Sequence, residues 1–115
     1  FVSIFCEQIM RVDKMAKIMM TFTHDFKSKW ELEAHLKRDH DDFMMIKDKL
    51  LELGMISAKR GILFNQKDKY RHTGFMEFKD VKSYEKCMKL LKGTDWDEEI
   101  ARVNRYEGYI IDSEV

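Results

Sequence analysis

The side chains best suited to chemistry lie in YRHTGFMEF, residues 70–78. This stretch follows a polar turn and predicts one strand of a hairpin, whose successive side chains point to opposite faces. Arg71 and Phe75 would then share the outward face, opposite the core. An exposed ring can stack on a nucleobase, and a guanidinium can hold a phosphate. We therefore expect this strand to offer one ring and one cation to an extended anionic ligand.

Further basic and aromatic side chains surround this strand. The polar turn NQKDK separates it from a second strand pattern at 56–64, which together predict an antiparallel hairpin. A last strand is expected at 100–106, where a second ring and another cation could join the surface. The residues that would add to the surface are Lys59, Arg60, Lys67, Lys69, Arg102 and Tyr106.

Motifs for metal binding and catalysis are weak. His35 and His40 match only the second half of a two-Cys, two-His zinc finger, and the region around Met19 and Phe22 supplies no cysteine. The sequence has no glycine-rich phosphate loop, no CxxC pair, no HExxH and no nucleophile elbow. Cys87 lies on the apolar side of a predicted helix, where a buried thiol is inert. We expect neither an enzyme nor a metal or other cofactor.

Helices and strands must position these side chains. Apolar residues at helical spacing across 2–22 predict one or two amphipathic N-terminal helices. KWELEAHL, 29–36, alternates like a half-buried strand, although its Glu, Leu and Ala favour a helix. A clearer helix is predicted at 41–53, with Gly54 as its stop, and another at 81–92.

From residue 29 the predicted order is strand, helix, strand, strand, helix, strand. This is the split βαβ arrangement, a ferredoxin-like α+β fold with an N-terminal helix added. If 28–38 were helical instead, two helices and the hairpin would form a winged helix-turn-helix, which is the alternative fold. The expected divisions are a helical extension at 1–26, the domain at 27–106 and a tail at 107–115.

The stretch RHTGFMEF, 71–78, resembles the third-strand motif of the RNA recognition motif, with Gly74, Phe75 and Phe78 in the family's spacing. KDVKSYEKCMKLLKG then has the family's usual length through the second helix, GTDWDEEIARVN resembles its turn and fourth strand, and IKDKLLELGMI its first helix and second strand. The resemblance implies an RRM-like fold that binds single-stranded RNA through a sheet-face ring and a basic hairpin. The implied contacts are Arg71, Phe75, Lys59, Arg60, Lys67, Lys69, Arg102 and Tyr106.

Charge leaves a protein partner open as the alternative. The chain has 115 residues, of which 21 are basic and 21 acidic, and a net charge of zero argues against an unspecific nucleic-acid binder. A strand at 29–36 would expose Glu31 and Glu33, which repel phosphates. The chain could instead be a protein-interaction module that docks a partner through residues 1–26 or this acidic face. A winged-helix DNA-binding regulator is the third hypothesis.

Location is only coarsely indicated. The two cysteines, Cys6 and Cys87, lie far apart and exclude a disulfide scaffold, which favours a reduced, intracellular protein. No apolar run approaches the roughly 18 residues of a membrane span, so no membrane partner is expected. The sequence does not separate nucleus from cytoplasm.

Overall fold

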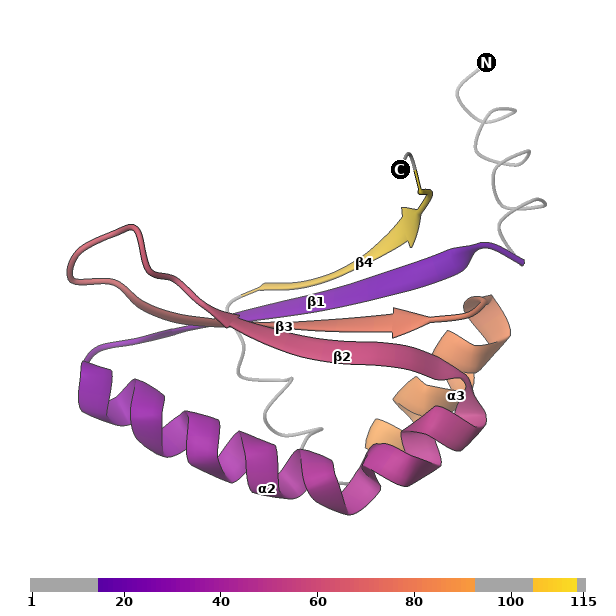
Figure 1. The fold of residues 1–115 in the computed structure, drawn as a ribbon, viewed down its shortest axis with the longest axis horizontal. Helices are drawn as coiled ribbons and strands as arrows, with labels where there is room; N and C mark the ends of the chain where they lie inside the picture. Colours follow the sequence, from indigo (N-terminus) through magenta and orange to yellow (C-terminus); the bar gives the residue numbers. More distant parts are fainter. Residues whose placement is uncertain (1–14, 93–104, 114–115) are drawn as a thin grey trace.

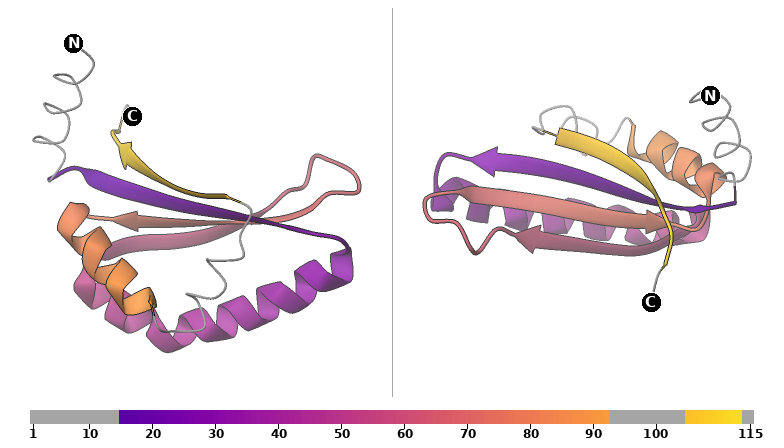
Figure 2. Two further views of the ribbon diagram at one scale, coloured as in Figure 1. Left: turned by 180° about the vertical axis from the view of Figure 1, so that it is seen from behind. Right: turned by 90° about the horizontal axis from the view of Figure 1, so that it is seen from above.

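The computed structural model describes residues 15–92 and 105–113 (Figure 1). Its elements are β1 (Lys17–Phe26), α2 (Lys29–Leu53), β2 (Met55–Ile62), β3 (Tyr70–Phe78), α3 (Val81–Leu91) and β4 (Arg105–Ile111). The strands form one antiparallel sheet in the order β2-β3-β1-β4. Both helices pack on one face of the sheet, and neither lies on the other face (Figure 2). The predicted βαββαβ fold is confirmed, and the winged helix is not formed.

The first strand is β1, so the prediction of a helix through this part of 2–22 was wrong. Ile18, Met20 and Phe22 are buried and alternate with more accessible residues, as in a strand with one face on the core. The outward Met19 is also apolar, so apolar residues occur on both faces and the period of two was hidden. Residues 17–26 thus belong to the sheet rather than to a helical extension, and residues 1–14 lie outside the described residues.

Helix α2 is continuous over 25 residues, so the prediction of a strand at 29–36 was also wrong. Ser28 caps the helix, because its Oγ accepts a hydrogen bond from the Glu31 backbone N–H at 3.1 Å. Leu32 and His35 face the sheet at helical spacing, while Trp30 is 75% exposed. Helix propensity therefore prevailed over a short alternation, and the acidic sheet face expected from Glu31 does not exist.

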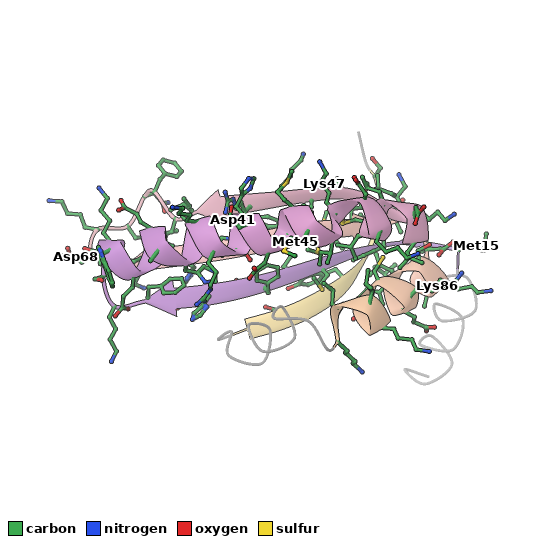
Figure 3. All side chains as sticks on the ribbon, turned by 90° about the horizontal axis from the view of Figure 1, so that it is seen from below. Met15, Asp41, Met45, Lys47, Asp68 and Lys86 are labelled. Atoms are coloured by element: carbon green, nitrogen blue, oxygen red, sulfur yellow. The ribbon has the colours of Figure 1, made fainter. Side chains whose placement is uncertain are left out.

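The outward side of α2 is polar and carries a few exposed methionines. Figure 3 views the helical layer from below, with Asp41 and Met45 on α2, and Met45 is 85% exposed. None of the helices in the described ranges combines the length and apolar character needed to span a membrane.

The core lies between the sheet and the two helices. Gly54 ends α2 with φ 114°, and a Cβ there would lie 2.2 Å from Ser83 Oγ at the start of α3. Cys87 is fully buried, and its burial raises the pKa of the thiol, as expected for an inert cysteine. The buried apolar cluster consists of Ile18, Met20, Phe22, Leu50, Met55, Met76, Phe78, Cys87 and Leu91.

The hairpin and the helix after it were predicted closely. The hairpin expected at 56–64 and 70–78 forms β2 and β3, and the helix expected at 81–92 forms α3. The last strand is β4 rather than 100–106, and residues 93–104 lie outside the described residues. Its sequence RYEGYII is rich in aromatic and β-branched residues, which favour a strand.

Replacing Asp80 by asparagine should remove part of the acid sensitivity of the fold. The Asp80 carboxylate accepts a hydrogen bond from the Ser83 backbone N–H at 2.7 Å, which holds the pKa of Asp80 below its ordinary value. A lowered pKa contributes stability above the unfolded value, near 4, that is lost as pH falls through the folded value.

Urea unfolding of both proteins between about pH 2 and pH 6 checks this, because asparagine still accepts the capping bond but does not titrate. The exposed Asp48, in the C-terminal half of α2, caps no helix, so Asp48→Asn is the matched control and should keep the pH dependence of the unaltered chain. Equal acid sensitivity of Asp80→Asn and the unaltered chain would contradict the capping argument.

Candidate functional site

The face of the sheet turned away from the helices, called here the outer face, carries alternate side chains of each strand. Phe75 is half-buried on this face, as the alternation in β3 predicted. Lys59 on the edge strand β2 is exposed, as is Glu107 on the opposite edge strand β4. Strand pairing places one row across the sheet, from β4 to β2, which consists of Glu107, Thr21, Phe75 and Lys59.

Neighbouring rows support the Phe75 ring. A Cβ at Gly61 would lie 3.5 Å from Phe75 Cε2, so the ring leans over the glycine on β2. Thr23 and Thr73 join β1 to β3 through a contact of 3.3 Å between their hydroxyl oxygens. In the row that holds Phe75 the two central side chains, Thr21 and Phe75, are uncharged and the charges lie at the two edges, while the central strands carry Arg71, Asp25 and Glu77 in other rows.

Arg71 lies on the outer face but is already engaged. Its Nε donates to Asp25 Oδ1 at 2.6 Å and its second nitrogen donates to Oδ2 at 3.2 Å. This bidentate bond raises the pKa of Arg71 further above its ordinary value. A phosphate at Arg71 would have to compete with that carboxylate.

The other predicted binding residues are dispersed. Arg60 points to the helical side, where its Nη1 donates to the Leu36 carbonyl at 2.8 Å. Lys67 and Lys69 are exposed in the connection between β2 and β3. Tyr106 pairs through its backbone with Phe22, and Arg102 lies outside the described residues. Among the predicted residues whose side chains the structure describes, only Phe75 and Lys59 lie side by side.

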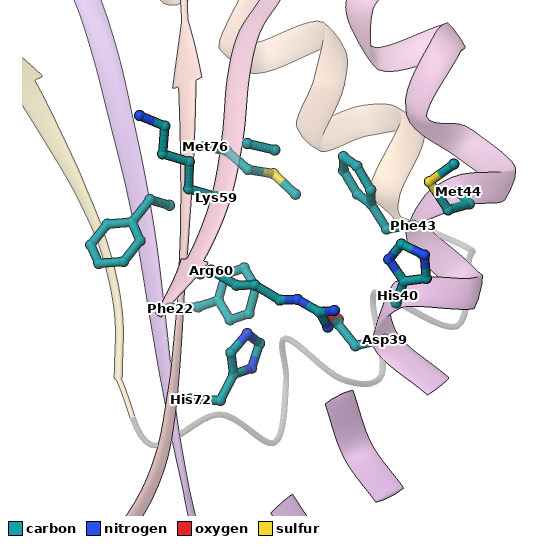
Figure 4. Close-up of a pocket in the computed structure, with 12 residues that line it drawn as sticks. Phe22, Asp39, His40, Phe43, Met44, Lys59, Arg60, His72 and Met76 are labelled. Carbon is teal, nitrogen blue, oxygen red and sulfur yellow. The ribbon is translucent and has the colours of Figure 1, made fainter. Parts of the chain in front are cut away.

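A second candidate site lies on the helical side, as a cavity of about 180 Å³ between α2 and the strands β2 and β3 (Figure 4). Arg60 and Asp39 point toward each other across it, while Lys59 points away. The Arg60 Nη1 lies 3.9 Å from Asp39 Oδ2. The lining residues are Phe22, Asp39, His40, Phe43, Met44, Ala58, Lys59, Arg60, His72, Gly74, Phe75 and Met76.

Histidines form the floor of this cavity and the core beside it. His72 is fully buried, and its Nδ1 lies 3.3 Å from Nε2 of the buried His35, so one ring donates to the other. His24 contacts His35 edge to face, with ring centres 5.2 Å apart. Within the described ranges, no three acidic, histidine or cysteine side chains are arranged to hold a metal ion.

Sequence reasoning missed this cluster. Its three histidines come from β1, α2 and β3, and only strand register and helix packing bring them together. His72 could have been placed on the core face by the alternation that placed Phe75 outside. No spacing in the sequence could have paired it with His35.

Two solved structures resemble the described architecture closely. The chain has a ferredoxin-like fold. One neighbour is a dimeric ferredoxin-like protein from an uncultured marine organism, with a TM-score of 0.75, 16% identity, and coverage of 87% of this chain and 99% of the neighbour. Another dimeric ferredoxin-like protein, also from an uncultured marine organism, has a TM-score of 0.71, 20% identity, and coverage of 92% and 96%.

The RNA recognition motif shares this ferredoxin-like fold. No family model matches the chain. No curated protein matches it either. The comparisons therefore establish the fold, and both neighbours are described as dimeric.

Proposed function

We propose that this chain is a protein-interaction module that self-associates through the outer faces of two sheets. The observation that carries the proposal is the row across the outer face, with a carboxylate at one edge, Phe75 in the middle and an ammonium at the other edge. Such a row is complementary to its own copy when the copy is turned end for end. Self-complementarity is what a two-fold symmetric dimer requires.

The arrangement follows from the strand order. A two-fold axis parallel to the strands, placed between two outer faces, lays β2 over β4 of the second copy and β3 over β1. Each Lys59 then faces a Glu107 of the other copy, and each Phe75 lies over a Thr21. Stacked sheets lie about 10 Å apart, a gap that phenylalanine and methionine side chains fill.

Two further features support self-association. Neither helix lies on the outer face, and Met19 and Phe75 are apolar side chains that would gain burial there. Both structural neighbours are described as dimeric ferredoxin-like proteins. The other protein-docking hypothesis places a partner on residues 1–26. Residues 1–14 of that segment lie outside the described residues.

Charge reversal tests the proposed axis. We expect Lys59→Glu and Glu107→Lys each to weaken self-association at least tenfold, because each places like charges opposite each other twice per dimer. The double variant Lys59→Glu/Glu107→Lys should return to within about threefold of the unaltered chain, since it restores both pairs. Sedimentation velocity over a range of concentrations measures this, and a double variant weaker than both single variants would contradict the axis.

Single-stranded RNA is the second candidate partner. This alternative goes together with the hypothesis that the chain belongs to the RNA recognition motif family. It is favoured by the resemblance at 71–78 and by Phe75 beside Lys59 on an open face. A base stacked on Phe75 would contribute about 1–3 kcal/mol. The bond between Arg71 and Asp25 and the carboxylates of Glu77 and Glu107 on the same face weigh against it.

The same variants separate the two candidates. RNA affinity would follow charge, so Glu107→Lys would strengthen binding of a fluorescent random-sequence RNA and Lys59→Glu would weaken it. Self-association would be weakened by both changes. Saturable RNA binding with that asymmetry, on a chain that stays monomeric, would favour RNA over the dimer.

A further inference from the structure

The cavity between α2 and β2–β3 has the form of a small-molecule site. Its walls are mainly apolar, from Phe22, Phe43 and Met76, with the half-exposed Met44 at the rim. Its volume of about 180 Å³ is close to that of engineered cavities, about 150 Å³, that hold benzene. The space therefore suits a molecule of one ring.

Polar groups converge at one side of this cavity. Asp39 is 8% exposed, and its Oδ2 lies 3.9 Å from Arg60 Nη1, which is longer than a direct hydrogen bond. A hydroxyl oxygen between the two could accept from the guanidinium and donate to the carboxylate. A ligand charge of either sign would meet one attraction and one repulsion at this pair, so it would gain little to offset the cost of losing its water.

We propose that this cavity binds an uncharged, single-ring molecule that carries a hydroxyl group. The ring packs against Phe22, Phe43 and Met76, and the hydroxyl bridges Arg60 and Asp39. The site opens on the helical side of the sheet, away from the outer face, so it does not depend on self-association.

The pair of His35 and His72 contributes a polar group to the floor of the cavity. Because His35 Nε2 and His72 Nδ1 share one hydrogen bond, the proton on either ring sets the tautomer of the other when both are neutral. His72 lines the cavity, so this pairing positions a polar ring edge beneath the ligand.

Phenol is a suitable probe, with toluene and benzoate as comparison ligands of similar ring size. We expect saturable shifts of the methyl signals of Met44 and Met76 in carbon-13 spectra of the full chain. Phenol should bind about fivefold more tightly than toluene, since it adds a hydrogen bond, and benzoate should bind most weakly. Equal or tighter binding of benzoate would overturn the assignment of an uncharged ligand.

Filling the cavity gives the second arm of the test. Ala58 lines the cavity on the edge strand, so Ala58→Leu should occupy the space and lower phenol affinity at least tenfold. Ala34 is exposed on α2 and does not line the cavity, so Ala34→Leu adds the same atoms elsewhere and should leave affinity unchanged. Identical phenol shifts in both variants, or shifts that never saturate, would show that the cavity is not a binding site.

Discussion

Replacing Gly74 by alanine should destabilise the fold by about 3 kcal/mol, near the upper end of the usual cost of overpacking a core. A Cβ at Gly74 would lie 2.2 Å from Phe22 Cζ and 2.4 Å from its Cε1, distances far too short for non-bonded carbon atoms. Phe22 is 3% exposed and packs edge to face on His72 with ring centres 5.7 Å apart, so its withdrawal would disrupt that contact. Either this packing is lost or strand β3 shifts away from the core.

Urea unfolding measures the effect, and the chain supplies its own control. A Cβ at Gly108 on β4 would meet no atom within 4 Å, so Gly108→Ala should change stability by less than about 1 kcal/mol. The double change Gly74→Ala with Phe22→Leu should regain part of the loss, because a smaller side chain makes room for the methyl group. Equal unfolding midpoints for Gly74→Ala and Gly108→Ala would show that the contact at Phe22 is not what requires glycine.

Replacing Phe75 by glutamate should weaken self-association about 100-fold or more while leaving the single chain folded. Phe75 lies at the centre of the outer face, where a buried apolar side chain contributes most to an interface. A carboxylate there would have to lose water without a cation opposite it, because the proposed axis places Thr21 of the second copy above it. In a single chain Phe75 is only half-buried on the outer face, so its replacement leaves the core between the sheet and the helices unchanged.

Sedimentation velocity and circular dichroism together test this result. Phe64 is 94% exposed in the connection after β2, so Phe64→Glu makes the same chemical change outside the outer face. We expect Phe64→Glu to self-associate like the unaltered chain. Undiminished association of Phe75→Glu would exclude the outer face as the interface, whichever way the two copies are turned.

The order of elements could be predicted from the sequence because its strongest signals are local. Alternation in β3, the capped helix α3 and Gly54 each depend on residues within a few positions. The first strand could not be found in this way, because Met19 places an apolar side chain on the outer face and mimics helical spacing. The predicted fold was right although its first strand was assigned to 29–36, which is part of α2.

The candidate site shows the same difference between features set by neighbouring residues and contacts between distant segments. The outward direction of Phe75 was predictable from alternation within one strand. Arg71 meets Asp25, and His72 meets His35, only through pairing of distant segments, so neither contact has a signature in the sequence. The direction of Arg60 was missed because a position on β2 was judged by its charge, whereas the pleat turns its side chain toward α2.

The most direct test of the proposed self-association is the molar mass of the full chain by sedimentation equilibrium over a wide concentration range. A two-fold contact between outer faces closes on itself, so we expect a mass that rises from 13.9 kDa to twice that value and goes no higher. A mass of 13.9 kDa at every concentration would contradict it, and growth beyond the dimer would contradict the closed symmetry.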